Sequence, residues 1–134
     1  MHLSHGLGFS RADRDTNIER IGWVASRLAR AGAVVVVAAI SPYAEARGRA
    51  RALTEAAGAA FAEVWVATPL AECERRDPKG LYARARAGDL PGMTGVDDPY
   101  EPPAAPDLVL DTAGEEPAAT AARLLAELGR RGLL

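Results

Sequence analysis

The run VVVVAAI at residues 34–40 constrains the fold of this chain more than any other stretch. All seven residues are apolar and five of them are β-branched. Such a run suits a strand that is buried on both faces, the usual environment in a parallel sheet. It is far shorter than the roughly 20 apolar residues that cross a bilayer. The sequence therefore predicts a buried strand here, within a parallel sheet.

Helical patterns flank this run on both sides. Ser10 is the predicted N-cap of the first helix, Asp13 takes the acid position of a capping box, and Gly32 ends the helix. Ser41 and Pro42 are the expected N-cap and first residue of a second helix. That helix would begin at the carboxyl end of the predicted strand.

The rest of the chain continues the alternation. Strands are predicted at 61–68 and 107–112, and helices at 69–75 and 117–131. Strands that alternate with helices are joined by crossovers, which give a parallel sheet with helices on both faces. The predicted fold class is therefore α/β, in one domain over residues 1–134. Ligands are expected beyond the carboxyl ends of the strands.

Charge and cysteine content exclude several classes of partner. The chain has 16 basic and 18 acidic residues, a net charge of −2, so neither nucleic acid nor an anionic membrane is the expected partner. The single cysteine, Cys73, allows no intramolecular disulfide and no cysteine cluster for a metal. No signal-peptide pattern occurs near the first residue, so we expect a cytoplasmic protein.

Residues 76–106 form a long irregular segment with six prolines and four glycines. Segments of this kind are usually lids, binding loops or disordered linkers. The only lysine, Lys79, lies there between Pro78 and Gly80, close to several arginines. Lysine reaches a phosphate as a point charge, and arginine binds it bidentately. The segment is either a lid over a phosphorylated small molecule or a solvated insertion.

Two further groups of residues have both a functional and a structural interpretation. Arg14 and Asn17 share one helix face, and Phe9 precedes that helix. They could hold a ligand, or Arg14 could pair with a nearby acid while Phe9 packs as a hydrophobic staple. Ser41 could cap its helix, contact an anion there, or do both. A Ser-His-Asp hydrolase is disfavoured, because both histidines lie near the start of the chain.

Several motifs together resemble the adenylylsulfate kinase (APS kinase) family. They are, in order, GLGFSRADRDTNIERIGWVA, AAISPY, ATPLAECERRDPKGLYARARAGDLPGMTGVDDPYEPP and DLVLDT. The resemblance extends over nearly the whole chain, and DPKGLYxxARAG followed by TGxDDPYEPP is highly specific. It implies a P-loop kinase fold. It also implies transfer of the ATP γ-phosphate to the 3′-hydroxyl of adenosine 5′-phosphosulfate (APS), which makes PAPS for sulfate assimilation.

The resemblance implies roles for residues before and after the predicted first helix. Phe9 matches an aromatic residue that stacks on the adenine of APS. Arg14 and Asn17 match an arginine and an asparagine that hold the phosphosulfate and the base region. Ile40 and Ser41 match the IS pair at the end of a strand, whose serine is traditionally marked as the active-site residue.

The resemblance also implies roles for residues of the predicted lid. Lys79 matches the lid lysine that reaches the phosphates of the substrates, and Arg76 is a candidate for ATP binding. Gly92 and Met93 match a Gly-Phe pair whose phenylalanine closes the other side of the adenine. Because Met93 replaces an aromatic ring with a thioether, we expect weaker APS binding. Ala44 stands where the family usually has an arginine.

One part of the family pattern is missing from this chain. The family begins with a strand, a GxxxxGKS P-loop with its helix, and a second strand that ends in DGD, and no G-x-x-x-x-G-K occurs here. The P-loop supplies the main ligands of ATP and Mg²⁺, so no metal ligand is expected from this chain. The P-loop strand also lies in the middle of the family's sheet, so the strands beside it would lose their partner.

Three interpretations follow. The chain is an APS kinase truncated at its N-terminus and impaired or inactive without its P-loop, or a non-catalytic APS- or PAPS-binding module that regulates a sulfate-activating complex, or a chain too unstable to function alone. The family resemblance further implies a possible homodimer and a possible association with ATP sulfurylase.

Overall fold

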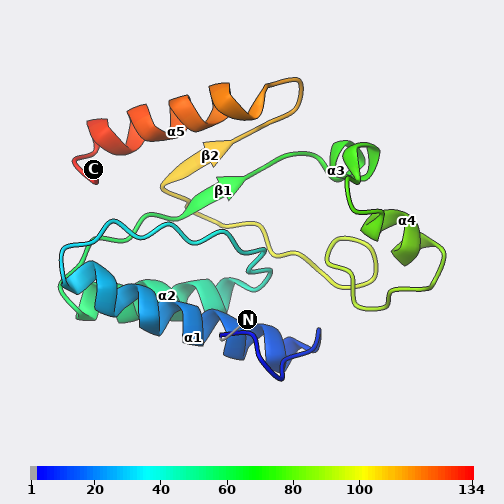
Figure 1. The fold of residues 1–134 in the computed structure, drawn as a ribbon, viewed down its shortest axis with the longest axis horizontal. Coiled ribbons are helices and arrows are strands. Elements are labelled where there is room, and N and C mark those ends of the chain that lie inside the picture. Colours follow the sequence, from blue (N-terminus) through cyan, green and yellow to red (C-terminus); the bar gives the residue numbers. More distant parts are fainter. Residues whose placement is uncertain (1–2) are drawn as a thin grey trace. The chain divides into compact units, whose positions relative to one another are not determined.

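The structure is a computed structural model that describes residues 3–134 (Figure 1). Its elements, in chain order, are α1 (Arg11–Arg30), α2 (Ala44–Ala56), β1 (Val64–Val66), α3 (Leu70–Arg76), α4 (Leu81–Arg86), β2 (Leu108–Leu110) and α5 (Pro117–Arg130). The chain is thus α/β, as predicted. No helix within residues 3–134 has the length and apolar character needed to cross a membrane.

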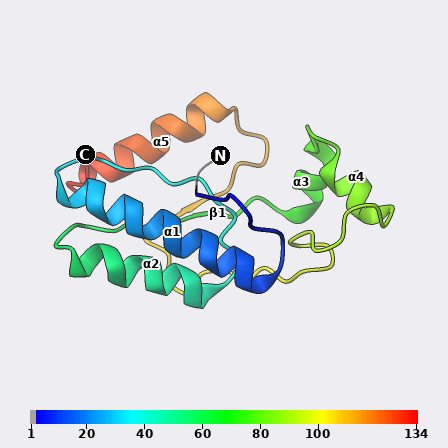
Figure 2. The same ribbon diagram turned by 60° about the horizontal axis from the view of Figure 1, so that its bottom comes forward.

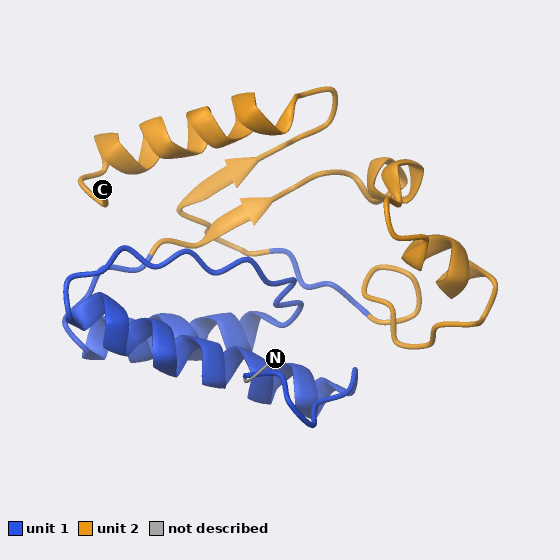
Figure 3. Ribbon diagram, viewed as in Figure 1, with its two compact units in different colours: residues 1–61, 99–102 blue, residues 62–98, 103–134 orange. Residues whose placement is uncertain are grey.

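The chain divides into two compact units (Figure 3). Unit 1 comprises Met1–Phe61 and Pro99–Pro102, and unit 2 comprises Ala62–Asp98 and Pro103–Leu134. Unit 1 contains α1 and α2, and unit 2 contains the sheet and the other three helices.

In unit 1, α1 and α2 lie side by side (Figure 2). The buried residues of α1 are Ile18, Gly22 and Ser26, which repeat every four positions along one face. A Cβ atom added at Gly22 would lie 3.2 Å from the Cβ atom of Ala50 on α2. Small side chains at this crossing therefore allow the two helices to approach closely.

Both ends of α1 follow the sequence prediction. Ser10 is the N-cap, and its hydroxyl oxygen accepts a hydrogen bond of 3.1 Å from the Asp13 backbone N–H. The same hydroxyl donates to the Asp13 carboxylate at 2.8 Å. At the other end, Gly32 has a φ of +89°, a conformation that glycine adopts without steric cost. The predicted cap and the predicted stop are both confirmed.

The start of α2 differs from the prediction. Its N-cap is Tyr43, not Ser41, and no side chain of the cap residue bonds to the helix. Ser41 has a φ of +43°, whereas an N-cap residue has an extended backbone. The backbone N–H of Ala44 donates instead to the carboxylate of Glu101, at 2.7 Å. A carboxylate from a distant part of the sequence thus replaces the predicted serine cap.

The prediction of a buried strand at 34–40 is wrong. This segment has no regular secondary structure, and Val34, Val36, Val37 and Ile40 are all exposed, Val36 to 83%. No described residue pairs with it, because the sheet contains β1 and β2 alone. A strand needs hydrogen-bonding neighbours for its backbone groups. Without such a neighbour among the described residues, the 34–40 segment forms no strand.

In unit 2, β1 and β2 form a two-stranded parallel sheet, in which Trp65 faces Val109 across the ladder. Leu110 is buried, at 3% exposure. The strands at 61–68 and 107–112 were correctly predicted in type and in parallel pairing, but each is only three residues long. Helix α5 begins with Pro117 at its first turn, as predicted. Its predicted apolar face is only partly covered, since Leu125 is 56% exposed.

Candidate functional site

The residues predicted to bind substrate belong to both units. Unit 1 carries Phe9, Arg14, Asn17, Ile40 and Ser41, and unit 2 carries Arg76, Lys79, Gly92 and Met93. Phe9 and Arg14 are in contact at the start of α1, and Asn17 lies further along the same helix. In unit 2, Arg76 ends α3, whereas Lys79 and the Gly92–Met93 pair lie in two tight turns.

Phe9, Arg14 and Asn17 form one group around the start of α1. The Phe9 ring is 66% exposed, so it does not pack as a hydrophobic staple. The Arg14 guanidinium lies 5.7 Å from the centre of that ring, and its Nε donates to the Phe9 carbonyl at 3.0 Å. The Asn17 side-chain oxygen accepts a hydrogen bond of 3.0 Å from Ser4. An exposed aromatic ring beside a guanidinium suits a planar base that carries an anionic group.

Ser41 lies in a short segment that Arg47 holds in place. The Arg47 guanidinium donates to the Ser41 carbonyl at 2.7 Å and to the Glu101 carbonyl at 2.7 Å. The backbone N–H of Glu101 also donates to the Pro42 carbonyl, at 2.8 Å. These contacts fix the left-handed backbone at Ser41, a conformation that is costly for a residue other than glycine. Ile40, the residue before it, is exposed.

Sequence reasoning did not single out Arg47 and Glu101. Arg47 is one of many arginines on a helix surface, and its spacing from Ser41 matches no capping pattern. Glu101 lies 57 residues from the backbone group that it caps. Its position in the TGVDDPYEPP motif was the only signal in the sequence, and that motif does not reveal its partner.

Lys79 lies in a tight turn between α3 and α4. The Asp77 carboxylate accepts hydrogen bonds from the backbone N–H groups of Tyr82, at 3.1 Å, and Ala83, at 3.0 Å, in the first turn of α4. The bond from Ala83 is the main reason that the pKa of Asp77 is lowered. Gly80 closes the turn with a φ of +64°. The Lys79 side chain is exposed and bonds to no other described residue, so a fixed turn presents a cation to solvent.

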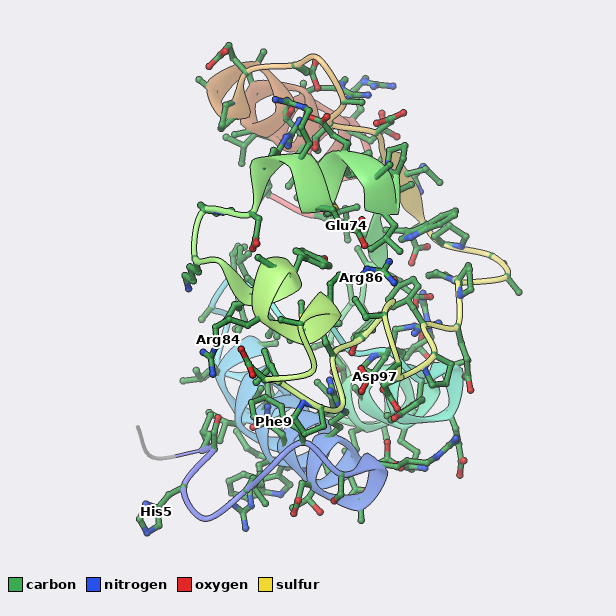
Figure 4. All side chains as sticks on the ribbon, turned by 90° about the vertical axis from the view of Figure 1, so that its right-hand side faces the viewer. His5, Phe9, Glu74, Arg84, Arg86 and Asp97 are labelled. Atoms are coloured by element: carbon green, nitrogen blue, oxygen red, sulfur yellow. The ribbon has the colours of Figure 1, made fainter. Side chains whose placement is uncertain are left out.

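Acidic residues hold most of the arginines near this turn. Arg86 on α4 bonds to Glu74 on α3 at 2.5 Å (Figure 4). Arg75 and Arg76 both bond to Glu72 at 2.7 Å. These two guanidinium groups, Arg75 first, lower the pKa of Glu72 to about 2. The arginines that were expected to clamp a phosphate are therefore largely occupied with acids.

Arg76 also joins the ends of the two strands. Its guanidinium donates to the Thr112 hydroxyl at 3.0 Å and to the Thr112 carbonyl at 2.6 Å. The hydroxyl groups of Thr112 and Thr68 share a hydrogen bond of 2.6 Å. Because Thr68 and Thr112 follow β1 and β2, this arginine stabilises the carboxyl edge of the sheet, where ligands of parallel sheets bind.

Gly92 and Met93 lie in a closed loop that Asp97 organises. The two carboxylate oxygens of Asp97 accept hydrogen bonds from the backbone N–H groups of Gly92, at 2.7 Å, and Met93, at 2.6 Å. Gly92 has a φ of +75°. The side chain of Met93 is half-buried.

The described residues do not fit a magnesium site. Within residues 3–134, no group of three or more histidine, cysteine, aspartate or glutamate side chains could hold a metal ion. The hydroxyl that a GxxxxGKS sequence would supply to the ion is also missing from this chain.

Comparison with known proteins identifies the family. The model of the family described as adenylylsulphate kinase matches residues 1–111. The adenylyl-sulfate kinase of Myxococcus xanthus is 50% identical over 132 residues, which are 98% of this chain and 71% of the relative. The sulfate adenylyltransferase of Chaetomium globosum is also 50% identical over 132 residues, but these are 23% of that relative. The chain therefore spans less than a quarter of some relatives that it matches.

A solved structure gives the same result. The Mycobacterium tuberculosis APS kinase CysC, solved in complex with AMPPNP and APS, superposes with a TM-score of 0.89 at 48% sequence identity. The match covers 95% of this chain and 75% of that one. With a family match over residues 1–111 and relatives at this level of identity, the chain belongs to the adenylylsulphate kinase family.

Proposed function

We propose that this chain is the APS-binding part of an adenylylsulfate kinase, which transfers the ATP γ-phosphate to the 3′-hydroxyl of APS to make PAPS. The observation that carries the proposal is the similarity to an APS kinase solved with both AMPPNP and APS. The residues that match the family's APS contacts are present, with Met93 in place of an aromatic residue, and Ala44 stands where the family usually has an arginine.

APS would be bound through the groups described above. The exposed ring of Phe9 offers a stacking face for adenine, and Arg14 lies beside it. Arg14 and Asn17 would bind the phosphosulfate and the base region. Ser41 follows Ile40 at the family's IS position and would contact the substrate near the reacting hydroxyl. Stacking of a base on an aromatic ring is worth about 1–3 kcal/mol, so Phe9 is the residue of this group with the largest expected contribution.

The lid would span about residues 76–106. Lys79, presented by its turn, would reach the phosphates of the substrates as a compact cation. Gly92 and Met93 would close the second side of the adenine, and Arg76 would contribute to ATP binding. We propose that residues 1–134 act together as one domain in this role.

The residues of this chain do not supply the main contacts to ATP. When bound, Mg²⁺ with the P-loop neutralises the triphosphate and positions its γ-phosphate, and this chain has no G-x-x-x-x-G-K sequence to hold them. We therefore expect APS binding with little or no turnover by the 134-residue form. Transfer of the phosphoryl group directly between nucleotides needs no covalent step on Ser41.

Location and assembly are part of the same proposal. We propose that the protein is cytoplasmic. We also propose that it works with an ATP sulfurylase, another name for a sulfate adenylyltransferase, because the match to that enzyme of Chaetomium covers 98% of this chain. A homo-oligomer is proposed as well. It is supported by a similar structure, the hexameric APS kinase from Thiobacillus denitrificans, with a TM-score of 0.72 at 34% identity.

Binding and turnover test this function separately. Calorimetric titration of the 134-residue chain with APS should show binding, and Phe9→Ala should weaken it about tenfold or more. Leu125→Ala, an exposed apolar change on α5, serves as the control and should bind normally. No binding of APS to the unmutated chain would refute the proposal.

A kinase assay with ATP, Mg²⁺ and APS completes the test. It compares this chain with a version extended upstream by an in-frame GxxxxGKS segment. The extended form should make PAPS and the 134-residue form should not. Equal turnover by both forms would show that the expectation about ATP is wrong, and a binding-competent but inactive extended form would favour the regulatory module.

A further inference from the structure

The loop at residues 92–98 is closed around one carboxylate (Figure 4). Asp97 accepts two short hydrogen bonds, one on each oxygen, from the consecutive backbone N–H groups of Gly92 and Met93. Hydrogen bonds to a charged acceptor are about twice as strong as neutral ones. A single side chain therefore holds two consecutive peptide groups, the one before Gly92 and the one between Gly92 and Met93.

Other hydrogen bonds hold the backbone carbonyl of Met93. The Met93 carbonyl accepts from the backbone N–H groups of Val96, at 3.0 Å, and of Asp97 and Asp98, both at 3.2 Å. The Gly95 N–H donates to the Asp98 carbonyl at 2.7 Å. Thr94, next to Met93, is buried. The Met93 backbone is thus bound through both its N–H and its C=O, while its flexible side chain is only half-buried.

The loop also packs on a helix of its own unit. A Cβ atom at Gly95 would lie 3.2 Å from a methyl carbon of Leu70, the first residue of α3. Gly95 has a φ of +86°, a backbone conformation that favours glycine. The loop therefore packs against α3 within its own unit.

We propose that Asp97 is a positioning residue for APS, which acts through Met93. It holds the Gly92–Met93 backbone so that the thioether side chain meets the adenine at one fixed place. This inference rests on the proposed function, because it takes Met93 as a contact of the nucleotide. The methionine side chain has three rotatable bonds. Before the nucleotide binds, the loop therefore determines the position of the Met93 backbone but not the conformation of its side chain.

The first test measures APS affinity of the full 134-residue chain after Asp97→Asn. Asparagine keeps one acceptor oxygen but turns an N–H₂ group toward the other backbone N–H, so one of the two bonds is lost. We expect about three- to tenfold weaker APS binding. The matched control is Asp89→Asn, which removes the same charge from a carboxylate that bonds to no other described residue. The control should bind APS as the unmutated chain does.

A double-mutant cycle with Met93→Ala separates positioning from general stability. If Asp97 acts through Met93, then Asp97→Asn should have little further effect on APS affinity in the Met93→Ala background. A loss that is the same in both backgrounds would overturn the inference. Urea unfolding of all four proteins shows that each is folded under the conditions of the titration, so that the coupling in APS affinity is read separately from any change in stability. If Asp97→Asn does not fold, Asp97→Glu replaces it, since this change keeps the charge and both oxygens but displaces them by one methylene group.

The outcomes distinguish this inference from the proposed function. APS binding by the unmutated chain together with an unchanged affinity in Asp97→Asn overturns the role of Asp97 alone. No APS binding by the unmutated chain overturns the proposed function, and the role of Asp97 falls with it. Weaker binding that depends on Met93 supports both.

Discussion

Strand β1 and the 34–40 segment are both runs of apolar and β-branched residues, but only β1 has a neighbour. The Val64–Val66 strand pairs with Leu108–Leu110 in unit 2. The 34–40 segment of unit 1 is longer and richer in valine, and it makes no ladder with any described residue. A strand thus forms only where two segments pair. The strand propensity of one segment does not by itself make it a strand.

The comparison predicts very different costs for similar truncations in the two regions. Leu110→Ala, at the buried last residue of strand β2, should lower the free energy of unfolding by about 2–5 kcal/mol, because it leaves a cavity. Val36→Ala removes a side chain that is 83% exposed and should change it by less than about 0.5 kcal/mol. Urea unfolding of the two variants gives both values. A large cost for Val36→Ala would mean that the segment is packed in solution.

The 34–40 segment, with exposed apolar side chains and unpaired backbone groups, should also promote self-association of the chain. Val36→Lys places a charge on the open segment and should lower the association of the chain several-fold at a given concentration. Light scattering over a concentration series measures it. The matched control is Leu125→Lys, which changes an exposed apolar residue on α5, where the helix satisfies its own backbone. The contrast fails if both substitutions lower association equally.

The starts of α2 and α4 are both capped by a carboxylate, from a distant residue in α2 and from a local residue in α4. Glu101→Ala removes the carboxylate that caps α2 from 57 residues away and should cost about 1 kcal/mol. Glu101→Gln keeps an acceptor and should cost less. Asp77→Ala removes the local cap of α4, so the amide hydrogens of Tyr82 and Ala83 should exchange faster, with α2 unaffected. Hydrogen exchange resolved by residue tests both, and faster exchange in the wrong helix would contradict the assignment.

The smallest effect concerns acid titration of the Glu72 cluster. Because Arg75 and Arg76 lower the pKa of Glu72 from 4.5 to about 2, the folded state favours the charged form. The stability that this carboxylate contributes is present above about pH 4.5 and is lost as the pH falls toward 2. Carbon NMR of the Glu72 carboxyl should give a midpoint near 2. A midpoint near 4.5 would show that the two ion pairs do not persist in solution.

Local signals in the sequence predicted the helices well. The hydroxyl of Ser10 and the left-handed Gly32 lie within one turn of the backbone groups that they serve, so the sequence determines both ends of α1. The same reasoning failed at Ser41, because Glu101 and Arg47 decide the local backbone there. The 34–40 segment could not be predicted from its own residues, since its state depends on whether a pairing strand is present.

For the candidate site, the sequence named residues but not how they are held. The resemblance to APS kinases pointed to Lys79 and Met93, and the structure adds the two carboxylates, Asp77 and Asp97, that fix the turns around them. Each bond joins a side chain to backbone groups a few residues away, but turn residues of this kind have no periodic pattern. The pairing of Arg75 and Arg76 with Glu72 was not predicted either. From composition alone, a cluster of arginines suggests a site that binds phosphate.

The position of the two tryptophans has a practical consequence. Trp23 lies on α1 in unit 1 beside Arg27 and is 56% exposed, whereas Trp65 lies in the ladder of unit 2. The sequence contains only these two, so each unit carries its own intrinsic fluorophore. Replacing one or the other with phenylalanine gives a chain whose emission reports on a single unit. Melting and ligand binding can then be followed spectroscopically in each half of the molecule without any added label.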